Sequence, residues 1–152
     1  MNKQRYVVVR VFLWIICTYH VVAGVAATFF KDAAVGIGGV LFGVSITMTP
    51  QAELLVRYLG AFAISFGLMT AFAALDPQGN TKIIYGAVVY FLVRAFDRIV
   101  FWKLLQEHST GPVPDWFRIV MILVMGLGLL IFMPRNPKTH LHATKETQHP
   151  MP

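Results

Sequence analysis

The chain has 152 residues, of which 57% are hydrophobic and 13% are charged, and its formal net charge is +6. Because soluble domains carry about 25% charged residues, this composition excludes an ordinary soluble domain and indicates an integral membrane protein. The positive charge does not indicate nucleic-acid binding, since the basic residues lie at the ends of apolar segments and not in a solvated patch with interleaved aromatic residues.

Four apolar segments are each close to the roughly 20 residues that a helix needs to cross the hydrocarbon core of a bilayer. The predicted spans are residues 7–30, 52–75, 81–103 and 116–133. The first is longer than the apolar part of a signal peptide, which has about 7 to 15 residues, so we expect it to remain as a transmembrane helix. Residues 1–133 are therefore predicted to form one all-α domain, an integral membrane four-transmembrane-helix bundle.

The links between these spans differ in character. Residues 76–80, Asp-Pro-Gln-Gly-Asn, favour a tight turn, so the second and third helices are expected to pack antiparallel as neighbours. Residues 33–48 are apolar, rich in glycine and borderline in length for crossing, and we expect an interfacial or re-entrant link there. The alternative is a fifth span, which would place the two chain ends on opposite sides. Residues 134–152 are polar and contain prolines, which predicts a flexible cytoplasmic tail.

Basic residues are divided unevenly between the two predicted membrane faces. With four spans, both chain ends and the 76–80 turn share one face, which carries seven basic residues: Lys3, Arg5, Arg10, Lys82, Arg135, Lys138 and Lys145. Because segments rich in lysine and arginine stay in the cytoplasm, both termini are predicted to be cytoplasmic in a multi-pass protein of a bacterial inner membrane.

Polar residues inside the spans form the candidate functional site. An ionisable group within a span costs on the order of 3 kcal/mol unless it is partnered, and it usually faces the bundle interior or a water-filled cavity. Two such groups, Arg94 and Asp97, share a helix face that Tyr90 extends by one turn. Counted from the same membrane surface, His20 lies level with Arg94, and the depths of Arg57, Arg94 and Asp97 nearly coincide. We therefore expect a buried network of His20, Arg57, Tyr90, Arg94 and Asp97.

Two interpretations of this network remain open. In one, the excess of arginine over carboxylate holds an anionic headgroup, a carboxylate ligand or an acidic residue of a partner subunit. In the other, the same groups only hold the helices together. The side chains of Arg98, Lys103 and Arg118 lie closer to the surface, so they are expected to extend outward to the headgroups. Glu53 and Arg57, four residues apart, are expected to pair.

The sequence contains no recognisable catalytic set or metal-ligand spacing. His140, His142 and His149 lie in the predicted flexible tail, where no fixed metal geometry is expected. The single cysteine, Cys17, is expected to behave as a small buried hydrophobic residue. We therefore expect no catalytic residues, no metal and no cofactor other than bound lipid.

Part of the chain resembles a known group of proteins. The matching stretches are TPQAELLVRYLGA at 49–61, Gly67, AALDP at 73–77 and YFLVR at 90–94. They are similar to the BphX-like and DoxX-like group of small bacterial four-helix membrane proteins, over about residues 31–103. The resemblance implies four helices but little chemistry, since functions in this group are largely unassigned.

The expected function is that of a non-enzymatic small integral membrane protein, an accessory or structural subunit of a larger membrane assembly. Its expected partners are membrane lipids and other integral membrane subunits or copies of itself. The alternative is a lipid- or small-anion-binding protein or transporter that uses the intramembrane arginines. A third class is a membrane redox enzyme that uses Cys17, Tyr19 or His20 near a quinone or a pigment.

Overall fold

The computed structural model describes residues 3–30, 32, 35–36, 49–108 and 113–134, and these residues form helices and no β-strand. The helices are α1 (Lys3–Phe29), α3 (Pro50–Leu75), α4 (Thr81–Val100), α5 (Trp102–His108) and α6 (Asp115–Phe132). The predicted all-α class is therefore confirmed. Most of the predicted 33–48 link, and the tail beyond residue 134, lie outside the described residues.

Local sequence signals define both ends of α3. The Thr49 side chain accepts a hydrogen bond from the Ala52 backbone N–H at 3.2 Å, and Pro50 occupies the first turn, where its missing N–H is not needed. After Leu75, the Asp76 carboxylate accepts hydrogen bonds from backbone N–H groups of the following turn. This turn leads directly into α4, so α3 and α4 are antiparallel, as predicted.

The third predicted span ends earlier than expected. The sequence pattern predicts a helix to residue 103, whereas α4 ends at Val100 and a separate helix, α5, begins at Trp102. α5 combines tryptophan and leucine with lysine, glutamine and glutamate, which is the composition of a helix at a membrane surface. The apolar run continues across this break, so hydropathy alone does not reveal it.

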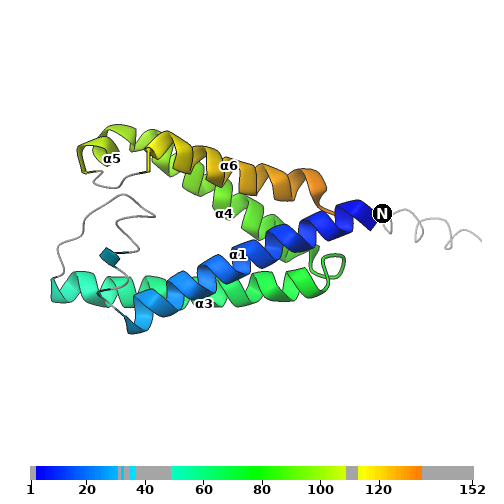
Figure 1. Cartoon of the computed structure of the whole chain (residues 1–152), viewed down its shortest axis with the longest axis horizontal. Coiled ribbons are helices and arrows are strands. Elements are labelled where there is room, and N and C mark those ends of the chain that lie inside the picture. Colours follow the sequence, from blue (N-terminus) through cyan, green and yellow to red (C-terminus); the bar gives the residue numbers. More distant parts are fainter. Residues whose placement is uncertain (1–2, 31, 33–34, 37–48, 109–112, 135–152) are drawn as a thin grey trace, which may run out of the picture.

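The long helices α1, α3, α4 and α6 run in alternating directions, and α1 begins at the end of the molecule where α6 finishes (Figure 1). α1 packs along α3, α4 packs along α6, and fewer contacts join the two pairs. The first pair is close because glycines face each other across it. A Cβ atom placed on Gly24 would lie only 2.6 Å from the carbonyl oxygen of Gly60.

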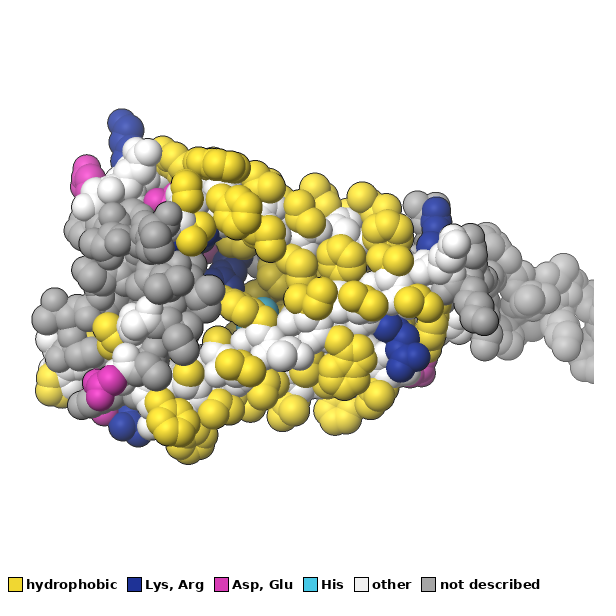
Figure 2. All heavy atoms as spheres, viewed as in Figure 1, with side chains coloured by type: hydrophobic (Ala, Val, Ile, Leu, Met, Phe, Trp, Pro, Cys, Tyr) yellow, Lys and Arg dark blue, Asp and Glu magenta, His cyan; other side chains and the backbone are white. Residues whose placement is uncertain are grey.

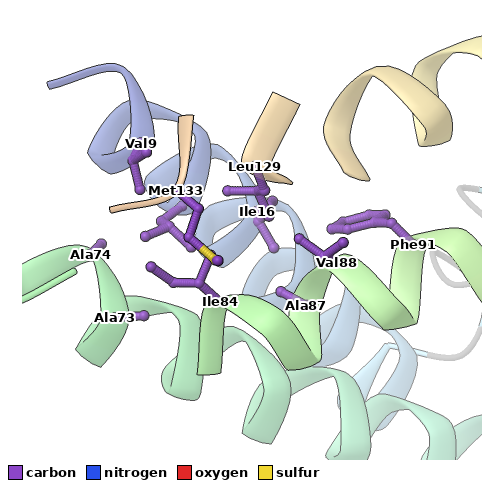
Figure 3. Close-up of a cluster of buried hydrophobic side chains, with 11 residues drawn as sticks. Val9, Ile16, Ala73, Ala74, Ile84, Ala87, Val88, Phe91, Leu129 and Met133 are labelled. Carbon is purple, nitrogen blue, oxygen red and sulfur yellow. The ribbon is translucent and has the colours of Figure 1, made fainter. Parts of the chain in front are cut away.

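The hydrophobic core lies toward one end of the molecule, and all four long helices contribute to it (Figure 3). It is formed near the start of α1, the α3–α4 turn and the end of α6. Arg10 Nε also donates a hydrogen bond to the Ala74 carbonyl there, at 2.9 Å. The core residues at this end include Val9, Leu13, Ala73, Ala74, Ile84, Ala87, Leu129 and Met133. From this core the two helix pairs diverge toward the α5 end (Figure 1).

Large apolar side chains cover the outside of the long helices, with charged side chains gathered toward both ends of the face that Figure 2 shows. Within the part of the chain that the structure describes, three helical segments are long and apolar enough to cross a membrane: Gln4–Phe29, Pro50–Leu75 and Asp115–Phe132. Soluble monomers rarely expose so much contiguous apolar surface, so these features identify a membrane protein. α4 is not among the three, and it carries Lys82, Arg94, Asp97 and Arg98.

Candidate functional site

A cavity of about 340 Å³ lies between α1, α4 and α6, next to the core and toward the α5 end. Figure 2 shows a recess between two apolar layers in which Lys or Arg atoms and His atoms are visible. Its wall is largely apolar, with Phe91 and Met125 among its residues. The described lining residues also include Arg94, Arg98 and Arg118. No aspartate or glutamate is among the described residues that line the cavity. The volume is at the lower end of the roughly 300 to 1,000 Å³ typical of small-molecule sites.

One carboxylate beside the cavity is shared by two guanidinium groups. Arg118 Nη1 lies 2.7 Å from Asp115 Oδ1, and Arg98 Nη1 lies 3.5 Å from the same oxygen. The three side chains are 6%, 7% and 11% exposed for Arg118, Asp115 and Arg98 respectively. α6 begins at Asp115, where a negative charge suits the helix dipole, and the spacing of three residues places Arg118 beside it. The triad thus carries one more positive charge than negative charge.

A second polar group connects α4 to α1. Arg94 Nη1 donates to the Tyr90 hydroxyl at 3.1 Å, across one helical turn. The Tyr90 ring lies 5.8 Å, centroid to centroid, from the ring of His20, which is 3% exposed. His20 Nδ1 is 2.8 Å from the carbonyl oxygen of Ile16 in the preceding turn of α1. His20 and Arg94 both line the cavity.

Of the five residues predicted to form the network, the structure brings together His20, Tyr90 and Arg94. Arg57 lies elsewhere, on α3, where its half-exposed side chain pairs with Glu53 at 2.9 Å. That ion pair is confirmed. Asp97 is exposed on α4, and neither Arg57 nor Asp97 lines the cavity.

The buried triad of Arg98, Asp115 and Arg118 was not predicted. The expectation that Arg98 and Arg118 extend outward is wrong, because their side chains are only 11% and 6% exposed. Lys103 is exposed, as expected. The sequence contained a signal for this ion pair, since Asp115 and Arg118 lie three residues apart at the start of the last span. That position is near the membrane level at which α4, with Arg98, ends.

Within the described ranges, no group of three or more His, Cys, Asp or Glu residues could hold a metal ion. The three tail histidines lie outside those ranges. Cys17 is a buried free thiol.

Comparison with protein-family models, curated proteins and solved structures finds no match to the chain. The resemblance to the BphX-like and DoxX-like group stays a prediction.

Proposed function

We propose that this chain is a four-span integral membrane protein that binds an anionic amphiphile, a molecule with an acidic group and an apolar chain, between α1, α4 and α6. One observation carries the proposal: Arg94, Arg98 and Arg118 line a single cavity whose other walls are largely apolar. Guanidinium groups pair with carboxylate and phosphate oxygens through strong charge-assisted hydrogen bonds. The apolar wall would accommodate the chain of the same ligand.

The arrangement of α4 supports its role as the fourth span. Its 20 residues extend roughly 30 Å, the thickness of the hydrocarbon core. Arg94 and Arg98 line the cavity, while Val89, Val93 and Phe96 are exposed along the same helix. Two of the four charged residues of α4, Arg94 and Arg98, are thus directed into the cavity and away from lipid, which is how ionisable residues are tolerated in spans.

The proposed orientation follows from the basic residues at the core end. Arg5, Arg10 and Lys82 belong to the start of α1 and the start of α4, which lie at this end. The preference for positive residues in the cytoplasm would place both termini there and the cavity in the outer half of a bacterial inner membrane.

The test compares two arginines that the sequence alone does not distinguish. We expect Arg94→Gln to weaken dodecanoate binding about tenfold or more, because a charge-assisted hydrogen bond contributes roughly 1.5 to 3 kcal/mol. Arg57→Gln should leave binding unchanged, since Arg57 pairs with Glu53 on α3. Native mass spectrometry of the protein in mild detergent measures both. Unchanged binding in Arg94→Gln, or equal loss in both variants, would refute the proposal.

The same experiment distinguishes whether the acidic group belongs to a fatty carboxylate or to a phospholipid headgroup. Phosphatidylglycerol and phosphatidylcholine are added in place of dodecanoate. We expect dodecanoate to bind best, because a cavity of about 340 Å³ suits one short apolar chain. Tighter binding of phosphatidylglycerol, lost in Arg94→Gln, would assign the site to a lipid headgroup.

The accessory-subunit role expected from the sequence stays a prediction. Purification in mild detergent tests it, since a stoichiometric complex with other membrane subunits would support this role. A lone monomer or homo-oligomer would contradict it without affecting the amphiphile proposal.

A further inference from the structure

The hydrogen bond made by His20 fixes the position of the proton on its ring. Nδ1 lies 2.8 Å from the Ile16 carbonyl oxygen, and a carbonyl oxygen can only accept. Nδ1 therefore carries the hydrogen and donates it. In the neutral ring, the other nitrogen, Nε2, then has a lone pair and acts as a hydrogen-bond acceptor.

This acceptor has no hydrogen-bond partner among the described residues, although His20 is only 3% exposed. The surrounding groups are aromatic rings, with centroids 4.8 Å away for Phe66, 5.0 Å for Tyr19 and 6.2 Å for Phe91. A buried polar atom without a partner is destabilising by about 1 to 3 kcal/mol. Since His20 lines the cavity, a molecule that fills the cavity is the natural source of the missing donor.

We infer that the bound amphiphile carries a hydroxyl group on its chain, and that this hydroxyl donates to His20 Nε2 while the arginines hold the acidic group. The inference rests on the proposed function and names its ligand class, a hydroxylated fatty carboxylate.

Tyr90 limits where on the chain the hydroxyl lies. The His20 ring centroid and the Arg94 guanidinium carbon are each 5.8 Å from the Tyr90 ring centroid. His20 and Arg94 are therefore at most about 12 Å apart, less than the length of an extended twelve-carbon chain, so the hydroxyl belongs within the chain and not at its far end. A terminal hydroxyl serves as the matched control.

The test compares ligands that differ only in the hydroxyl group. Dodecanoate, 3-hydroxydodecanoate, 6-hydroxydodecanoate and 12-hydroxydodecanoate are titrated against the wild-type chain and the His20→Phe variant, with native mass spectrometry as the readout. Phenylalanine retains a ring but removes the acceptor. We expect the 3-hydroxy or the 6-hydroxy compound to bind the wild type about five- to tenfold more tightly than dodecanoate, the effect of one hydrogen bond. This advantage should disappear in His20→Phe, and the 12-hydroxy compound should show none.

The inference is overturned if no hydroxylated compound binds the wild type more tightly than dodecanoate, a comparison that needs no variant. It is also overturned if the advantage persists in His20→Phe while dodecanoate affinity is retained, which shows that the variant is folded. In either case, dodecanoate binding that depends on Arg94 would leave the proposed function intact. If neither the wild type nor Arg94→Gln binds any of the four compounds, the proposed function itself is refuted.

Discussion

The Asp115 carboxylate lies beside buried arginines of both α4 and α6. Its Oδ1 lies 2.7 Å from Arg118 Nη1 and 3.5 Å from Arg98 Nη1, and its side chain is 7% exposed. Burying an ion pair is nearly neutral when the pair is complete, but removal of one partner leaves an uncompensated charge in a medium of low dielectric constant. The stability of this end of the molecule should therefore depend strongly on the Asp115 charge.

We expect Asp115→Asn to lower the free energy of unfolding by about 3 kcal/mol, since two guanidinium groups would then lie beside a neutral amide. Asp97→Asn is the matched control, because Asp97 is exposed and its replacement should change stability by no more than about 0.5 kcal/mol. Denaturant unfolding in detergent, followed by circular dichroism, measures both variants. Equal effects would show that the Asp115 charge does not stabilise the fold.

The contacts of the site that could be predicted from sequence are those between residues of the same helix, because their spacing along the chain fixes whether they meet. Tyr90 and Arg94 are one turn apart, and that spacing correctly places them in contact. Contacts between helices depend on how each helix is rotated about its axis. α3 is apolar on nearly all sides, so its sequence does not show whether Arg57 faces inward. For the same reason, the pairing of Arg98 with Asp115 could not be derived.

At the scale of the helices, the α1–α3 contact depends on the absence of side chains at its crossing. A Cβ atom on Gly24 would lie 2.6 Å from the Gly60 carbonyl oxygen and 2.8 Å from the Ile64 backbone nitrogen. Both are backbone atoms, which cannot move aside as a flexible side chain would. Association of helices in lipid relies on such close approach, because burial of apolar surface gives little advantage there.

We expect Gly24→Ala to destabilise the protein by about 1 to 3 kcal/mol, because α1 and α3 would have to separate. Gly86→Ala is the control within α4, where an added Cβ would meet nothing within 4 Å. That substitution should be neutral or stabilising by up to about 1 kcal/mol, through the higher helix propensity of alanine. Thermal unfolding in detergent distinguishes the two. A Gly24→Ala protein as stable as Gly86→Ala would exclude a tight glycine contact.

The lengths of the helices could be predicted from sequence better than their junctions. Apolar length and the capping residues place α1, α3 and α6 within about one turn of the predicted spans. The end of α4 at Val100 could not be predicted, because apolar residues continue through Phe101 and Trp102 into α5.

At the scale of the whole molecule, the described helices pack around a core at one end and diverge toward the other. Core residues close the end that holds the α3–α4 turn, while the cavity lies toward α5. An amphiphile in this cavity would fill space between the helix pairs and add contacts that join them. Binding and packing of the two pairs are therefore expected to be coupled.

The side of the membrane on which each end of the bundle lies gives a direct test of the four-span arrangement. Gln4, Gln78 and Gln106 are all exposed, at the start of α1, in the α3–α4 turn and in α5. In a Cys17→Ala background, Gln4→Cys, Gln78→Cys and Gln106→Cys are made singly and treated in intact cells with a membrane-impermeant maleimide. We expect labelling of Gln106→Cys alone, and labelling of the other two only after permeabilisation, because in the proposed four-span arrangement α4 crosses the membrane and positive residues stay inside. The opposite pattern would retain four spans but reverse the orientation. Labelling of Gln78→Cys and Gln106→Cys from the same side would show that α4 does not cross, and the arginines of its cavity face would then lie at a membrane surface and not within it.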